Sequence, residues 1–152
     1  MNSSTQATAT GERADLLAAL AKARYFLRFT VRDLTDDQAR QRTTVSELSL
    51  GGLIKHVALT ERQWASGFQM LEGETLAGLL DRYEEVARRT DELVTTLPDL
   101  DAAQALPEAP WFPPGARWSA RQVLLHVVAE TAQHSGHADI IRESLDGAKT
   151  MG

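Results

Sequence analysis

Hydrophobic residues recur at helical spacing along most of the chain. In residues 12–34 the apolar positions are three or four apart and share one stripe of a helix: Leu16, Leu20, Ala23, Leu27, Val31 and Leu34. Thr35 can cap a short turn after this stripe, and residues 40–47 are polar and rich in Thr and Ser. The pattern therefore predicts one long helix followed by a connecting loop.

Three later segments carry similar apolar faces with start and stop signals. The predicted helices span residues 49–73, 75–97 and 119–145. Ser49 and Ser119 are suitable N-caps, and Pro98 and Gly147 are suitable stops. No segment shows the alternation of a strand.

All five prolines lie between residues 98 and 117. This composition predicts a long crossover without regular structure, in which Trp111 and Phe112 cover one end of the helices. The expected fold is all-α: a four-helix bundle with a long Pro-rich crossover between helices three and four. Residues 1–11 are polar and are expected to form a mobile tail, and residues 12–152 a single domain.

The amino-acid composition and the net charge argue against several classes of function. The chain of 152 residues has a net charge of −5 and no basic cluster, which argues against nucleic-acid binding. It has no apolar run long enough to span a membrane and no basic, apolar leader, so a cytoplasmic location is expected. Because the chain contains no cysteine, any metal must be held by His, Asp, Glu or water.

In the last predicted helix, polar residues occupy several positions of the stripe that should face the core (its apolar seam). A four-three rhythm joins Val123, Val127, Glu130, His134, His137 and Ile141. A carboxylate in such a seam costs several kcal/mol unless it is paired or bound to metal. Metal binding is therefore one explanation, and a hydrogen-bonded polar network or a metal-free general base are the others.

Spacing alone leaves three pairs of ligands open on this helix. Glu130 with His134, His126 with Glu130, and His134 with His137 are each one turn apart. His56, on the second predicted helix, could reach across the bundle as a third ligand. A site of two histidines and one carboxylate leaves positions open for water or substrate, as catalytic zinc or non-haem iron requires.

Two stretches of the chain resemble the signature regions of the DinB-like superfamily. They are residues 44–64, TVSELSLGGLIKHVALTERQW, and residues 118–142, WSARQVLLHVVAETAQHSGHADIIR. The similarity is closest to the mini-circle protein branch, which is related to mycothiol-dependent maleylpyruvate isomerase. This resemblance implies an up-up-down-down bundle and a divalent metal held by His56, Glu130 and His134.

The resemblance also implies a chemistry. Relatives include thiol S-transferases, so a low-molecular-weight thiol of the mycothiol type and a small electrophile are the expected partners. Zinc is the expected metal, with nickel, iron and manganese as alternatives. Coordination removes the proton of a thiol, which then attacks an electrophilic carbon. Relatives often pair as homodimers.

Three further residues are candidates for substrate binding. Arg142 could hold a carboxylate of the thiol or of the substrate, Trp64 could wall the pocket, and His137 could contact substrate or orient a ligand. His126 has no assigned role. The alternative to a transferase is a metal-binding DinB-like stress or interaction protein without turnover.

Overall fold

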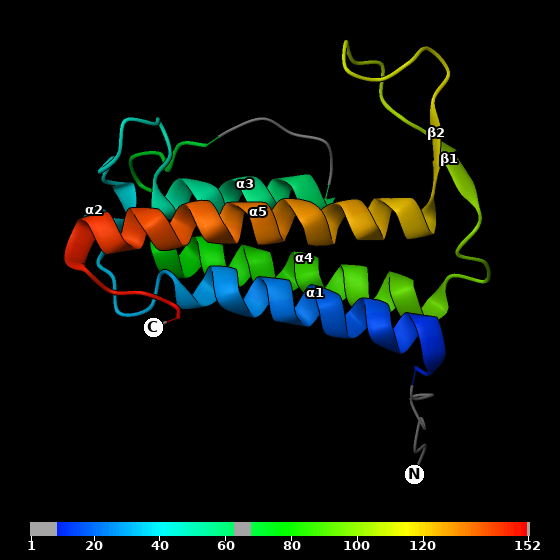
Figure 1. Ribbon diagram of the computed structural model, residues 1–152, viewed down its shortest axis with the longest axis horizontal. Helices are drawn as coiled ribbons and strands as arrows, with labels where there is room; N and C mark the ends of the chain where they lie inside the picture. Colours follow the sequence, from blue (N-terminus) through cyan, green and yellow to red (C-terminus); the bar gives the residue numbers. More distant parts are fainter. Residues whose placement is uncertain (1–8, 63–67, 152) are drawn as a thin grey trace.

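The long helices form where the apolar stripes lie. The computed structural model describes residues 9–62 and 68–151. Its elements in chain order are α1 (Gly11–Phe29), α2 (Asp36–Arg40), α3 (Leu50–Arg62), α4 (Leu76–Thr96), β1 (Ala103–Ala105), β2 (Arg117–Ser119) and α5 (Ala120–Asp146). The predicted all-α bundle is confirmed, with α1, α3, α4 and α5 as its four helices (Figure 1).

The predicted caps account for most helix ends. The Ser119 side chain accepts a hydrogen bond from the backbone N–H of Gln122, and the Gln122 side chain accepts one from the backbone N–H of Ser119, which forms a capping box at the start of α5. Thr35 and Gln38 form the same motif at α2. Gly147 ends α5 in the left-handed conformation, with φ of 80°, which favours glycine.

Two helices end earlier than predicted. α1 stops at Phe29 rather than at residue 34 because Thr30 and Arg32 turn their carbonyl groups to the guanidinium of Arg142 instead of continuing the helix. Val31 nevertheless remains buried. The extension of the second predicted helix to the Gly73 region is also wrong, because residues 68–71 are not helical.

Residues 68–75 instead return beside the first half of α3. The backbone of Gly52 touches the carbonyl group of Phe68 so closely that a Cβ at residue 52 would overlap it. Lys55 donates a hydrogen bond to the Gln69 carbonyl and forms an ion pair with Glu74. The apolar pattern continued past the helix because Phe68 and Met70 pack against the core from this returning segment.

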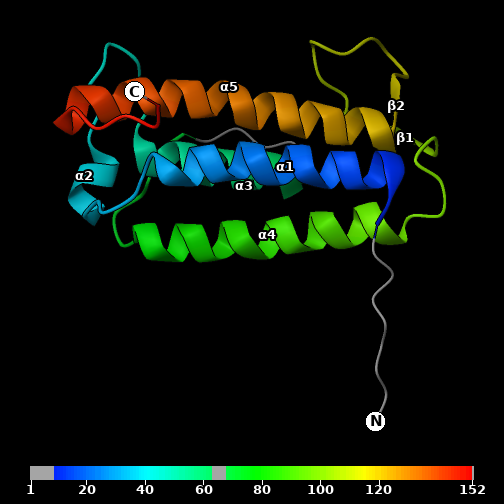
Figure 2. The ribbon, with the colours of Figure 1, turned by 60° about the horizontal axis from the view of Figure 1, so that its bottom comes forward.

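The directions of the four long helices differ from those that the resemblance implied. α1 and α5 run one way, and α3 and α4 run the other, so the order is up, down, down, up rather than up-up-down-down (Figure 1). α5 packs against both α1 and α3, and α4 packs against both α3 and α1 (Figure 2). The first and last helices are therefore neighbours.

The Pro-rich connection lies between α4 and α5 as predicted, and residues 106–116 have no regular structure, but two short strands flank them. β1 and β2 pair antiparallel, with Gln104 opposite Trp118, and form a hairpin that projects from the end of the bundle (Figure 1). The expectation that no strand forms was wrong. The sequence pattern does not reveal these two short strands because they have no alternating apolar face. The expectation that Trp111 covers the bundle was also wrong, since Trp111 is 75 % exposed.

The buried core is divided into two apolar clusters by polar side chains. The larger cluster includes Leu27, Ile54, Tyr83 and Ile141, and the smaller one lies toward the hairpin end and includes Leu20, Val94 and Val127. Apart from Arg142 near the end of α5, the buried polar residues of the long helices lie between the two clusters or at their border: Arg24, His56, Thr90, Thr131 and His134. A polar layer therefore crosses the middle of the bundle.

No helix in the described ranges, 9–62 and 68–151, is both long and apolar enough to cross a membrane. The predicted tail, residues 1–11, falls mostly outside these ranges, and Gly11 already belongs to α1.

Candidate metal centre

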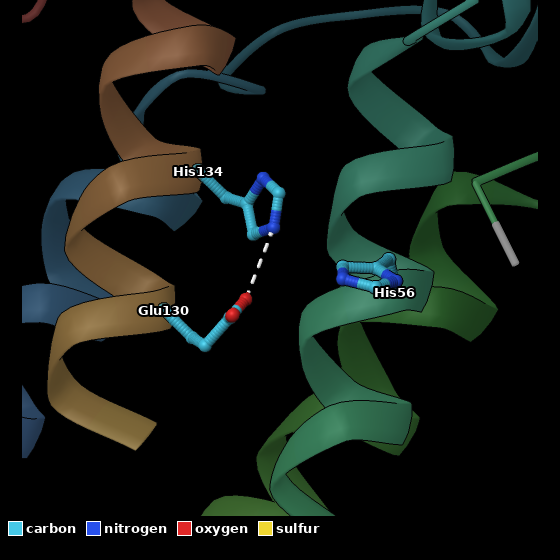
Figure 3. A group of neighbouring side chains, drawn as sticks. All are labelled: His56, Glu130 and His134. Atoms are coloured by element: carbon cyan, nitrogen blue, oxygen red, sulfur yellow. Dashed lines mark ion pairs between the residues drawn. The ribbon is translucent and has the colours of Figure 1, made fainter. Parts of the chain in front are cut away.

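Three potential ligands from two neighbouring helices meet at one side of the polar layer. His56 comes from α3, and Glu130 and His134 come from successive turns of α5 (Figure 3). One ligand atom from each residue lies within 4.8 Å of the others. Spacing on α5 left three pairs of ligands open, and the pair that lies together with His56 is Glu130 and His134.

The distance between the two α5 ligands suits a shared ion. Nε2 of His134 lies 3.2 Å from Oε2 of Glu130. Two ligands that each bind zinc at about 2.0 to 2.2 Å in tetrahedral geometry are about 3.3 to 3.6 Å apart. The pair therefore needs little rearrangement to bind one cation, and a ligand atom of His56 lies within 4.8 Å of both.

The three side chains differ in their exposure to solvent. His56 and His134 are buried, and the side chain of Glu130 remains 29 % exposed. The Phe68 ring stacks on His56 with centroids 4.0 Å apart, and His56 meets His134 edge to face at 4.8 Å. Aromatic packing thus orients both imidazoles, while the carboxylate keeps the site open to solvent.

The electrostatics favour neutral imidazole at His134. Burial lowers the pKa of His134, the charge of Glu130 opposes this shift, and His137 adds to it. A neutral imidazole has the lone pair that a metal ligand needs. Two imidazoles and one carboxylate then form a donor set with net negative charge, which fits a divalent cation.

The two other α5 histidines lie at the edges of this cluster. Nδ1 of His137 is 3.2 Å from Nδ1 of His134, on the side of the ring away from Glu130. Nε2 of His126 is 3.9 Å from Oε1 of Glu130, which is an ion-pair distance rather than a hydrogen bond. His137 is therefore placed to fix the tautomer of His134, as partners of ligating histidines do.

Of the candidate substrate residues, Arg142 is not brought to the cluster. Arg142 is buried, donates to the carbonyl groups of Thr30 and Arg32, and pairs with Asp146. Its guanidinium is committed to the end of α1, so its interpretation as a substrate anchor does not fit the structure. Trp64 lies outside the described residues.

A second buried polar group, which the sequence analysis missed, lies in the same layer. Arg24 of α1 donates to Glu61 of α3 and, at 2.8 Å, to Oδ1 of Asp91 of α4. The Glu61 side chain is fully buried and that of Arg24 is 8 % exposed. Burial opposes the charge of Arg24, but its bonds to both carboxylates outweigh this effect and raise its pKa.

Tyr83 lies between the two polar groups. Burial, reinforced by the charge of Glu61, raises the pKa of its hydroxyl, and Thr131 contacts that hydroxyl. Thr131 follows Glu130 in α5. The sequence did contain a signal for Arg24, because it lies four residues after Leu20 and three before Leu27, on the stripe of α1.

Comparisons with known proteins agree with this architecture. The chain matches the family model described as Mycothiol-S-transferase over residues 15–69 and 64–147. A crystal structure described as the conserved protein of locus from Enterococcus faecalis is similar in fold, with a TM-score of 0.67 and 12 % identity over 92 % of this chain and 100 % of that one. No curated protein matches significantly in sequence. Because the family model covers most of the chain, this protein belongs to the mycothiol-S-transferase family of the DinB-like superfamily.

Proposed function

We propose that this protein is a divalent-metal-dependent transferase that uses a low-molecular-weight thiol of the mycothiol type and a small electrophile. The observation that supports it most directly is the cluster of His56, Glu130 and His134 in a member of this family. Zinc is the proposed metal because imidazole and carboxylate donors at these positions suit it.

His56, Glu130 and His134 would hold the ion. A divalent cation supplies positive charge that lowers the pKa of a thiol sharing its coordination shell, so the sulfur is a thiolate at neutral pH. The chain's residues prepare the site for this chemistry. Phe68 shields His56, His137 orients His134, and the exposed edge of Glu130 leaves a path for substrate.

The arrangement favours turnover over a purely structural ion. A structural zinc normally has four protein ligands, whereas three residues form this cluster within the described part of the chain. His137 faces the nitrogen of His134 that is remote from Glu130, so it is not placed to supply a fourth ligand. Positions for a thiol therefore remain open.

Cobalt substitution tests this proposal directly. Because the chain has no cysteine, a near-ultraviolet charge-transfer band that appears when mycothiol is added to the cobalt protein would report the sulfur of the added thiol. We expect a saturable band in the wild type and none in Glu130→Ala. Glu143→Ala, an exposed carboxylate on the same helix, is the matched control and should keep the band.

Two results would contradict the proposal. Cobalt bound without a thiol band would exclude the thiol chemistry and leave the alternative of a metal-binding protein without turnover. A protein that binds no cobalt would exclude the metal centre itself. Metal analysis of protein purified without a histidine tag would identify the native ion.

A further inference from the structure

Residues 106–110 and 112–116 of the hairpin between α4 and α5 line an open hollow of the size of a small-molecule site. Its volume is about 510 Å³, within the range of about 300 to 1,000 Å³ that ligand sites occupy. Leu106, Phe112 and four of the five prolines line it, and Glu108 is the one charged residue among its lining residues. Because each proline fixes its own φ angle, the loop has little freedom to collapse into the hollow.

A continuous series of ring contacts joins this hollow to the candidate metal centre. Phe112 meets Trp118 with ring centroids 5.6 Å apart, and Trp118 meets His126 at 5.2 Å. His126 then lies beside Glu130, with 3.9 Å between Nε2 and Oε1. Phe112, which lines the hollow, is therefore linked through Trp118 and His126 to the carboxylate of the candidate metal centre.

The local fold determines this alignment. Trp118 lies in β2 directly before the N-cap of α5, so strand pairing and the capping box hold its ring over the first turns of the helix. The tip of the hairpin leans back over the same turns in both views (Figures 1 and 2). Trp111, next to Phe112 with ring centroids 6.2 Å apart, extends the series to solvent.

A second exposed aromatic group provides a useful contrast. Tyr25 is 59 % exposed, and its ring contacts in the described part of the chain are with Phe26 and Phe29 of its own helix, α1. Exposed aromatic rings are thus not unusual on this surface. Tyr25 also lines a hollow, of about 740 Å³, so the hairpin rings differ in that their series leads to the candidate metal centre.

We propose that the hollow and the ring series of Phe112 and Trp118 bind the apolar or aromatic tail of the electrophilic co-substrate. This inference rests on the proposed transferase function and names the class of electrophile that it takes. Because Trp118 and His126 lie between the hollow and Glu130, the co-substrate is elongated, with its reactive carbon at one end and its apolar tail at the other.

Binding of an unreactive aromatic probe tests the inference without requiring metal or turnover. Equilibrium dialysis of 2-naphthol against the metal-free protein should show one saturable site. Phe112→Ala should weaken binding at least tenfold, and Trp111→Ala, at the outer end of the series, about threefold. Tyr25→Ala is the matched control and should leave the affinity unchanged.

Further measurements keep the result interpretable. Circular dichroism should show unchanged helical content in each variant, and Phe112→Leu, which keeps the apolar volume but loses the ring, should also weaken binding if the hairpin of Phe112→Ala does not fold. Cobalt affinity should be the same in all of these variants, because none of them removes a ligand. In the cobalt protein, bound 2-naphthol should show paramagnetic broadening that is absent in the zinc protein.

Several outcomes would overturn the inference. Unchanged affinity in both Phe112→Ala and Phe112→Leu would exclude the hollow, and equal loss in Tyr25→Ala would show non-specific adsorption. Tighter binding of myo-inositol, the polyol part of mycothiol, than of 2-naphthol would assign the hollow to the thiol instead. If the thiol band of the cobalt protein is absent while 2-naphthol binds as expected, the transferase proposal fails and the binding site remains.

Discussion

The two buried polar groups of the bundle differ in the charges that their side chains bring together. Arg24, Glu61 and Asp91 bring opposite charges together within α1, α3 and α4, so the buried guanidinium of Arg24 has two carboxylate partners. His56, Glu130 and His134 bring lone pairs and negative charge together without a side-chain cation. The first group therefore contains its own counter-charges, whereas we propose that the second binds a cation from outside the chain.

This difference shows how a structural polar layer can be separated from a functional one. A buried ion pair that satisfies itself needs no explanation beyond packing. A cluster of metal-ligand side chains that is partly open to solvent is a candidate for binding a partner from outside the chain. The following predictions test that distinction, from the largest expected effect to the smallest.

Breaking the ion pair should cost the most stability. Glu61→Ala leaves Arg24 buried with only the partly exposed Asp91 as partner. We expect the free energy of unfolding to fall by about 3 to 5 kcal/mol, measured by urea denaturation of the metal-free protein. The double variant Arg24→Met, Glu61→Leu should recover most of this loss, and a loss below about 1 kcal/mol in the single variant would contradict a stabilising role.

Metal should stabilise the wild type by a similar amount. A ligand that binds only the folded state adds about 4 kcal/mol when its free concentration is 1,000 times Kd. Zinc should therefore raise the Tm, and a chelator should lower it without unfolding the protein, because four amphipathic helices supply most of the stability. Unfolding on chelation would instead assign a structural role to the ion.

Removal of a ligand should affect metal binding far more than the fold. We expect His134→Ala to lose measurable zinc binding by calorimetry, while the metal-free protein loses less than about 2 kcal/mol and keeps its helical circular dichroism. Comparison with Glu61→Ala in the same buffer tests whether the two polar groups differ. Equal destabilisation by the two variants would remove the distinction.

The pH dependence of the metal-free protein should show the smallest effect. Because burial lowers the pKa of His134 below its usual 6.5, the unfolded chain binds more protons at this residue than the folded chain does. Stability from this group is therefore complete above pH 6.5 and declines as the pH falls through 6.5 toward the lowered pKa. Subtracting the urea-denaturation profile of His134→Ala should isolate the decline.

The sequence predicts some parts of this structure better than others for physical reasons. Helical periodicity and caps such as Ser119 are local, so α4 and α5 begin and end close to where they were expected. The end of α1 depends on Arg142, which is distant in the chain, and no local pattern reveals it. The hairpin was missed because its strands are short and exposed.

The ligand residues of the candidate site could be proposed because Glu130 and His134 interrupt an apolar seam. Spacing could not choose their partner, since that choice depends on α3 packing against α5. Arg24 interrupts the stripe of α1 in the same way, yet its partners lie on two other helices. Arg142 was misinterpreted because a guanidinium that binds backbone carbonyl groups looks the same in the sequence as one that binds substrate.

The up, down, down, up order has a consequence for how the protein is made. The helices that carry Arg24, Glu61 and Asp91 are synthesised before α5, so the ion-pair group can assemble while the last helix is still emerging. Two of the three proposed metal ligands arrive only with α5, which packs against both α1 and α3. The nascent chain therefore cannot capture metal at this centre until synthesis is nearly complete, which protects the site from being loaded on an unfinished fold.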